Sequence, residues 1–152
     1  MLLASRAVPL VDLVDDTFVV APPPVLAAEF ADRASWRRWW PGLLLELDED
    51  RGVEGVRWFV TGGRRGKGWR AGDLTGTSEV WLEPYRDGTI VHFYLRADPV
   101  RALPADALKR RRWGDRVQRR HAVAFKRRLH DLKDRLERAR LVGEASASSR
   151  RR

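Results

Sequence analysis

Three tryptophans stand within five residues of this chain, at Trp36, Trp39 and Trp40, directly before Pro41 and Gly42. An indole buries a large apolar surface, so a cluster of this kind is typical of the wall of a core or a pocket. The Pro-Gly pair ends a helix and turns the chain. The segment therefore predicts a packed corner between a short helix and a strand. We expect so short a helix to bury only one or two of the three rings deeply.

The composition limits the class of protein. The chain has 152 residues, which is enough for one domain with a hydrophobic core. It contains no cysteine, which excludes disulfides, thiolate metal sites and cysteine nucleophiles. No apolar run is long enough to span a bilayer or to form the core of a signal peptide. We expect a cytoplasmic protein with no metal site and no cofactor.

The charge of the chain is unevenly distributed. Residues 1–103 carry 13 basic and 15 acidic side chains, a net charge of −2, whereas residues 104–152 carry 17 and 6, a net charge of +11. Of the 30 basic residues 26 are arginines, a bias that GC-rich coding also produces. Acidic residues are interleaved at Asp131, Asp134 and Glu137, with an expected i,i+4 pair between Lys133 and Glu137. A solvated helix face is therefore favoured over a nucleic-acid site, and weak contact with anionic membranes stays open.

Runs rich in β-branched and aromatic residues alternate with turn signals through the first two thirds of the chain. Three prolines precede a short expected helix over residues 25–32, and Ser35 is the expected N-cap of a second short helix that carries the tryptophans. The glycine-rich segment 62–68 lacks the ending of a phosphate-binding loop and predicts a hairpin loop. The expected strands are residues 11–21, 43–48, 56–61, 69–74, 77–83 and 89–97.

From about residue 104 to residue 141 the periodicity becomes helical. Residues 1–9 are expected to form a flexible N-terminus, residues 10–141 one domain, and residues 142–152 a disordered basic tail. The helix needs a broad partner surface, and the sheet is the candidate. At 100° per residue one helix face collects Gly114, Val117, Gln118, His121, Phe125, Leu129, Leu132 and Leu136.

The order of elements predicts an α+β architecture, in which a curved antiparallel sheet of about six strands wraps around a long C-terminal helix. With Trp39-Trp40-Pro41 after the short helices and Trp81-Leu82-Glu83-Pro84 before a glycine turn, the chain resembles the START-like (helix-grip, SRPBCC) superfamily, in its polyketide cyclase/dehydrase and lipid-transport branch. The resemblance covers residues 10–141. It implies a cavity between sheet and helix that holds apolar ligands, and it supplies no catalytic motif.

The Asp87-Gly88 turn sets an expected strand register. A two-residue loop at this turn places Glu83 opposite His92 and gives the sheet one entirely apolar face, which should meet the helix. Glu83 and His92 could form an acid/base dyad, but we favour a solvent-side pair on the convex face. Trp81 and Tyr94 share that outer face and could form an interface. The apolar face consists of Val80, Leu82, Val91, Phe93 and Leu95.

Polar residues gather on the inner face of the helix near its N-terminal half. His121 is the best candidate for a catalytic or ligand-orienting group, with Tyr94 second, and the alternative for His121 is a core-edge histidine bonded to a backbone carbonyl. The expected ligand-binding residues are Trp39, Trp40, Trp58, Val80, Leu82, Val91, Phe93, Leu95, Gln118, His121 and Phe125.

Three functions follow as hypotheses. The first is binding or transport of a small hydrophobic ligand, such as a lipid or polyketide, by a monomer or homodimer. The second is a polyketide cyclase or aromatase, an enzyme in which His121 would supply the acid/base group. The third is association with nucleic acid or an anionic membrane through the basic C-terminal helix.

Overall fold

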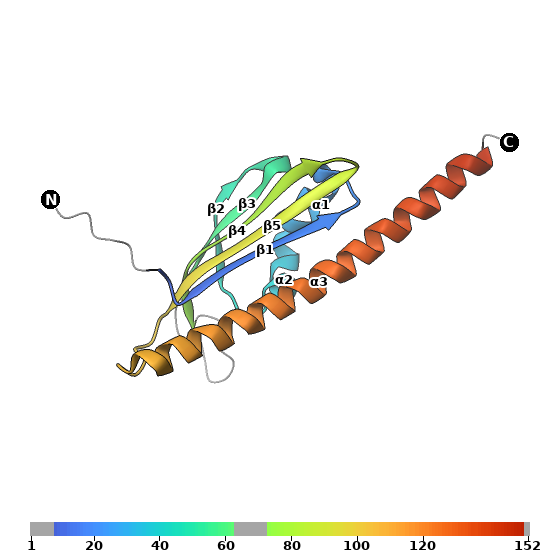
Figure 1. Cartoon of the computed structure of the whole chain (residues 1–152). Helices are drawn as coiled ribbons and strands as arrows, with labels where there is room; N and C mark the ends of the chain where they lie inside the picture. Colours follow the sequence, from blue (N-terminus) through green and yellow to red (C-terminus); the bar gives the residue numbers. More distant parts are fainter. Residues whose placement is uncertain (1–7, 63–72, 151–152) are drawn as a thin grey trace.

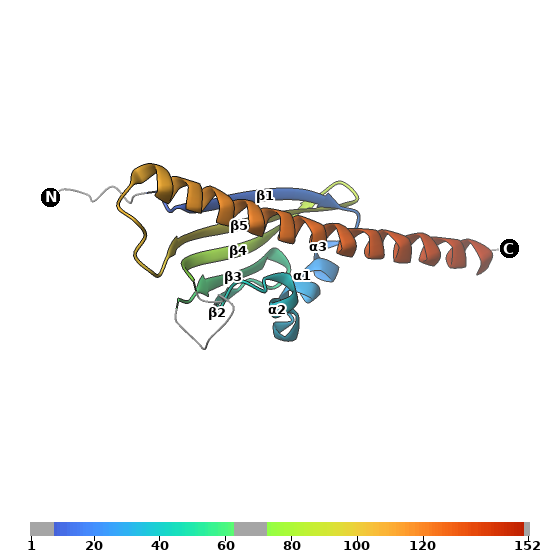
Figure 2. The same cartoon turned by 90° about the horizontal axis from the view of Figure 1, so that it is seen from below.

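The computed structural model describes residues 8–62 and 73–150. A five-stranded antiparallel sheet, in the order β1-β5-β4-β3-β2, lies against a long C-terminal helix (Figure 1). The helices α1 and α2 lie beside that helix on the same side of the sheet (Figure 2). The elements are β1 (Val11–Val19), α1 (Pro23–Ala31), η1 (Arg33–Ser35), α2 (Trp36–Trp39), β2 (Leu45–Asp50), η2 (Gly52–Glu54), β3 (Gly55–Val60), β4 (Leu74–Tyr85), β5 (Gly88–Pro99) and α3 (Ala107–Arg150).

This architecture confirms the expected α+β helix-grip arrangement. The described residues form five strands, one fewer than expected. The expected strand 69–74 lies outside the described residues except for its last two positions, and the expected loop 62–68 lies outside them except for its first. In the described part of the chain, no helix is long and apolar enough to cross a membrane.

The start of α1 and the start of α2 are set differently. Helix α1 begins at Pro23, as proline in the first turn allows. Ser35 stands at the N-cap position of α2, but its side chain does not make the expected cap hydrogen bond to a described residue. Its hydroxyl donates to the carbonyl oxygens of Asp32 at 2.7 Å and Glu29 at 3.2 Å. A capping hydrogen bond is made one turn earlier, at the start of η1, where the Asp32 carboxylate accepts from the backbone N–H of Ala34.

The β4–β5 register differs by two residues from the expected one. The turn residues are Arg86 and Asp87, and Trp81 rather than Glu83 lies directly opposite His92. Gly88 pairs with Tyr85 and is the first residue of β5. Glycine is needed there because a Cβ would lie 2.3 Å from the Val19 carbonyl oxygen. A shift of two residues keeps every side chain on its face. The apolar face is therefore as expected, and all five of its residues are buried.

Helix α3 carries the expected buried face and also covers the open edge of the sheet. Every residue of the predicted stripe from Gly114 to Leu136 is buried or half-buried. Within that stripe, Gln118 accepts a hydrogen bond from the Asp12 backbone N–H at 3.0 Å. Lys133 donates to the Phe18 carbonyl oxygen at 2.9 Å. Because β1 is an edge strand, these side chains satisfy backbone groups that no described strand pairs with.

The C-terminal helix is longer than the sequence predicts. It continues nine residues past position 141, through the segment expected to be a disordered tail. Gly143, the second residue of that expected tail, lies inside the helix. One glycine costs a helix only about 1 kcal/mol relative to alanine, which neighbouring helix formers offset.

Gly114 allows α3 to approach β1 closely, and this generates a prediction. A Cβ at position 114 would lie 2.6 Å from the Leu10 carbonyl oxygen, whereas a Cβ at Gly143 would meet nothing within 4 Å. Alanine at either site gains about 1 kcal/mol of helix propensity. We expect Gly114→Ala to lower the free energy of unfolding by about 1–3 kcal/mol despite that gain, and Gly143→Ala to leave it unchanged or raise it. Urea unfolding checks both, and equal effects would contradict the close contact.

Candidate functional site

An aromatic cluster fills the space between the sheet, α2 and α3. Phe93 of β5 and Phe125 of α3 stack with ring centroids 4.1 Å apart. Trp40 stacks on the same pair at 6.0 and 6.3 Å and lies 4.6 Å from Trp58 of β3. Trp39 contacts Phe125 at 6.0 Å. These rings bring residues from four parts of the chain together at the position where the sequence predicts a ligand-binding cavity.

All three tryptophans of the corner are buried, so the expectation that only one or two would be buried is wrong. The reason is that α2 ends at Trp39. Trp40 has left the helix, with φ −135° and ψ 71°, so its side chain is not tied to the helical spacing. Phe30 of α1, which the sequence analysis did not single out, completes the corner by packing 4.9 Å from Trp39.

Two indole N–H groups in the cluster lack a hydrogen-bond acceptor among the described residues. Trp40 and Trp58 are 3% and 0% exposed, and the Nε1 of each has no partner in the described part of the chain. Trp36 provides the contrast, because its Nε1 donates to the Phe30 carbonyl oxygen at 2.8 Å. A buried donor without an acceptor costs about 1–3 kcal/mol. Two such donors on neighbouring rings are therefore the unusual chemical feature of this core.

The predicted ligand-binding residues divide into two groups. One group is buried around the aromatic cluster and on the apolar sheet face: Trp39, Trp40, Trp58, Val80, Leu82, Val91, Phe93, Leu95 and Phe125. The other group consists of Gln118 and His121 on α3. The Gln118 side-chain oxygen is bonded to the β1 backbone, so this residue ties the helix to the sheet edge.

His121 lies beside a small cavity at the N-terminal end of the site. The cavity measures about 60 Å³ and its lining includes Trp113, Val117, Asp73 and Arg120. Burial, with a smaller contribution from the Arg120 charge, lowers the pKa of His121 to about 4. The imidazole is therefore neutral at pH 7. It is able to donate or accept a hydrogen bond without the cost of burying a charge.

A solved structure of another protein shares this arrangement of sheet and helix. No protein-family model and no curated protein matches the chain. Among solved structures, TTHA0849 from Thermus thermophilus aligns with a TM-score of 0.51 and 16% identity, over 84% of this chain and 98% of its own. The chain therefore has a helix-grip fold, an antiparallel sheet lying against a long C-terminal helix, and TTHA0849 shares this fold.

Two further solved structures align less closely. The Aha1 dimer from Colwellia psychrerythraea matches at 14% identity and a TM-score of 0.49, over 82% of this chain and 94% of its own. The di-domain ARO/CYC StfQ from the steffimycin biosynthetic pathway matches at 16% identity and a TM-score of 0.48, over 85% of this chain and 51% of its own. At such identities the likeness concerns the fold alone.

A groove opens on the outer side of the helix-grip core, next to Trp39. Its volume is about 730 Å³, and it runs between α1, α2 and α3. Trp39 and Leu132 are its apolar lining residues. The charged ones are Glu29, Arg37, Arg38, Arg128, Asp131, Asp134, Arg135 and Arg138. Since Trp39 also packs against Phe125, its side chain separates this groove from the other rings of the aromatic cluster.

The outer face of the sheet holds a second group of titratable side chains. The ring nitrogens of His92 lie 2.8 Å from a Glu83 oxygen and 2.5 Å from an Asp16 oxygen, and the Trp81 ring stacks on the imidazole at 4.5 Å. The expected solvent-side position of Glu83 and His92 is thus what the structure shows. Asp16 carries no signal in the sequence, because no local pattern sets the pairing of β1 with β5.

The low pKa of His121 makes folding stability depend on pH. Between about pH 6.5 and pH 4 the unfolded chain binds a proton at this residue that the folded protein does not bind. Acidification therefore favours unfolding, by about 1.4 kcal/mol for each pH unit in that window. The free energy of unfolding, measured in urea, should fall from pH 7 to pH 4.5 in both proteins. The fall should be about 2–3 kcal/mol larger in the wild type than in His121→Gln.

His130 provides the matched control, because it is exposed on the same helix. His130→Gln should retain the pH dependence of the wild type. If His121→Gln instead retained the full loss of stability on acidification, His121 would not be the group that is buried in its neutral form.

Proposed function

We propose that this protein binds a small, largely apolar ligand that carries a hydrogen-bond-accepting oxygen, between the sheet and α3. The observation that carries the proposal is the pair of buried indole N–H groups of Trp40 and Trp58, which have no acceptor among the described residues. A ketone, ester or carboxylate oxygen would accept from one or both. The surrounding rings offer the apolar contact that typical ligand sites use for affinity, while the few polar groups set orientation.

The energetics support a ligand in preference to a permanently dry core. Leaving two donors unsatisfied costs about 2–6 kcal/mol in total, which a ligand oxygen reduces on binding. A pure hydrocarbon would gain only the apolar contacts. The proposed lining is therefore the aromatic cluster and the apolar sheet face, with neutral His121 as a second polar contact. Gln118 is not included, because the Asp12 N–H occupies its oxygen.

The groove beside Trp39 is the proposed route of entry. Trp39 lies between the groove and the cluster, on a helix of four residues that Pro41 and Gly42 follow. Displacement of this single ring would connect the groove of about 730 Å³ with the donors of Trp40 and Trp58. The proposed place of binding is the cytoplasm, a reducing compartment that suits a chain without cysteine.

Two measurements test the function. Native mass spectrometry of the purified protein should show a co-purified small molecule, released on denaturation. Tryptophan fluorescence should report binding of a long-chain methyl ketone, with affinity about 3–10-fold higher than that for the alkane of equal length, the range expected for one hydrogen bond. Equal affinities for the two compounds, or no binding of either and no co-purified molecule, would contradict the proposal.

Tryptophan variants identify the donor. Trp40→Phe and Trp58→Phe each remove one of the two N–H groups and keep an aromatic ring. The preference for the ketone should fall toward onefold in the variant that loses the bonded donor, and should fall partly in both variants if both indoles donate. Trp81→Phe, on the outer face of the sheet, should leave that preference unchanged. Trp36→Phe should mainly reduce stability, by about 1–3 kcal/mol, because it leaves the buried Phe30 carbonyl oxygen without its donor.

A further inference from the structure

The outward face of the first half of α3 carries a row of arginines with no partner among the described residues. We call this row the arginine stripe and define it as Arg112, Arg116, Arg119, Arg120 and Arg127. All five are exposed, and none forms a hydrogen bond or an ion pair with a described residue. Some basic side chains elsewhere on the described surface form ion pairs with carboxylates, whereas others, such as Arg37 and Arg38, form none with a described residue; the paired ones are Arg51, Arg57, Arg96, Lys126, Lys133, Arg135 and Arg140.

The stripe follows the helical repeat. At 100° per residue these positions fall within a sector of about 100° on one side of α3, over about 22 Å of helix axis. Residues 107–130 contain ten basic side chains and one acidic side chain, Asp115. From Asp131 onward the excess is smaller, since residues 131–152 carry 7 basic and 4 acidic side chains. The charge is therefore concentrated in one segment and is not a general property of the arginine-rich chain.

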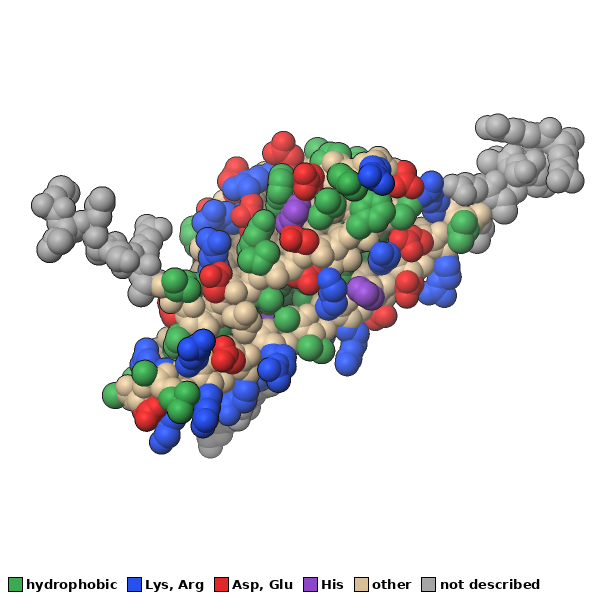
Figure 3. Space-filling model, viewed as in Figure 1, with side chains coloured by type: hydrophobic (Ala, Val, Ile, Leu, Met, Phe, Trp, Pro, Cys, Tyr) green, Lys and Arg blue, Asp and Glu red, His purple; other side chains and the backbone are tan. Residues whose placement is uncertain are grey.

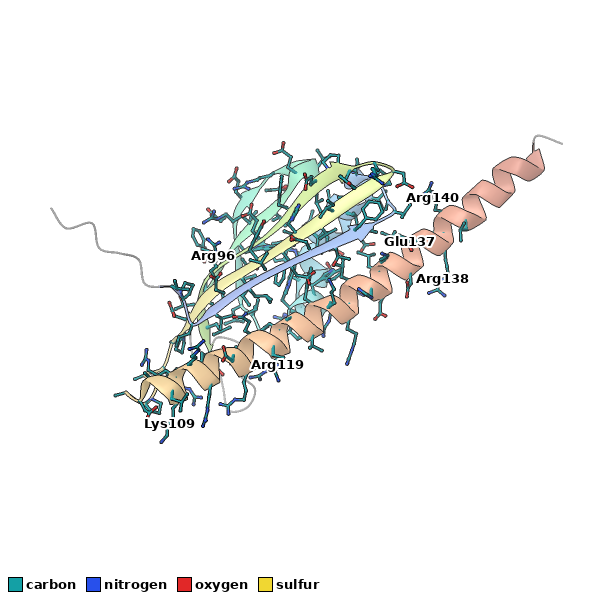
Figure 4. The ribbon with its side chains drawn as sticks, in the orientation of Figure 1. Arg96, Lys109, Arg119, Glu137, Arg138 and Arg140 are labelled. Atoms are coloured by element: carbon teal, nitrogen blue, oxygen red, sulfur yellow. The ribbon has the colours of Figure 1, made fainter. Side chains whose placement is uncertain are left out.

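Nothing in the described part of the chain covers the centre of this face, and Arg120 at its edge also lines the cavity beside His121. The sheet lies on the opposite side of α3, and Arg119 projects away from it (Figure 4). In the space-filling view, Lys and Arg side chains follow the lower edge of the molecule along the first half of α3 (Figure 3). A flat, negatively charged surface could contact the whole stripe at once.

Two apolar side chains share this face of the helix. Leu108 is 57% exposed and Val123 is 52% exposed. At 100° per residue Val123 falls within the sector of the stripe, and Leu108 lies about 20° beyond its edge. Nucleic-acid phosphates would gain nothing from them. A bilayer interface would gain about 0.8 kcal/mol for each CH2 group that it takes up. This observation favours a membrane over a nucleic acid.

We propose that the arginine stripe docks the protein on anionic membrane surfaces, with α3 parallel to the bilayer plane. Guanidinium groups bind lipid phosphates through paired hydrogen bonds. Each basic residue near an anionic surface adds about 1 kcal/mol, so several together give reversible attachment that salt weakens. The inference does not depend on a ligand in the core.

Vesicle flotation with the full chain tests the proposal. The protein should partition onto vesicles that contain phosphatidylglycerol at low salt, and only weakly onto pure phosphatidylcholine. Arg116→Glu with Arg119→Glu should weaken the partition at least tenfold, from the loss and reversal of two charges. The control pair is Arg37→Glu with Arg38→Glu, which makes the same change in net charge at two exposed arginines off the stripe. It should weaken the partition less than threefold.

A second double variant separates the two kinds of polyanion. Leu108→Ser with Val123→Ser should reduce vesicle partition severalfold and leave retention on heparin and duplex DNA unchanged. Circular dichroism and melting temperature confirm that each variant is folded. Absence of wild-type binding to the anionic vesicles overturns the proposal. Equal loss in both arginine pairs, or DNA binding tighter than vesicle binding with no effect of the two serines, also overturns it.

Discussion

The stacking of Phe93 on Phe125 is the contact on which the rest of this structure depends. It joins the middle of β5 to the middle of α3 at a centroid distance of 4.1 Å. Trp40 packs against both rings and fixes the end of the α1–α2 segment against the same point. Since aromatic rings are rigid and large, their shapes set the separation of helix and sheet. The position of the candidate ligand site follows from this contact.

A core built in this way has a chemical cost that an aliphatic core does not have. Leucine and valine side chains carry no polar atoms, whereas each indole brings an N–H group into the interior. Trp36 offsets this cost through the Phe30 carbonyl oxygen, and Trp40 and Trp58 find no such acceptor among the described residues. The cost thus falls on the rings that lie between sheet and helix, where we propose that the ligand binds. For this reason the polar part of the site is better sought at these rings than at His121 alone.

The sequence predicted the faces of the sheet more reliably than its register. Alternation of apolar and polar residues identified Val80, Leu82 and Phe93 as buried, and it survived a register error of two residues because side chains repeat with a period of two. The turn position was wrong because Gly88 serves a close approach to β1, which is a long-range contact. Pairing of β1 with β5, and with it the position of Asp16 beside His92, could not be derived from local patterns.

Helix α3 combines three roles that periodicity alone does not separate. One side packs into the core through Phe125 and Leu129, and the flank beside it bonds to the β1 edge through Gln118 and Lys133. The hydrophobic stripe describes the first role only. It placed Gln118 on the inner face without its bond to β1, and Lys133 was expected on the solvated face. The remaining side, around Arg119, makes no contact with the described residues that requires a positive charge. Folding thus accounts for the polar residues beside the core and leaves the arginines of the outer face to interactions outside the chain.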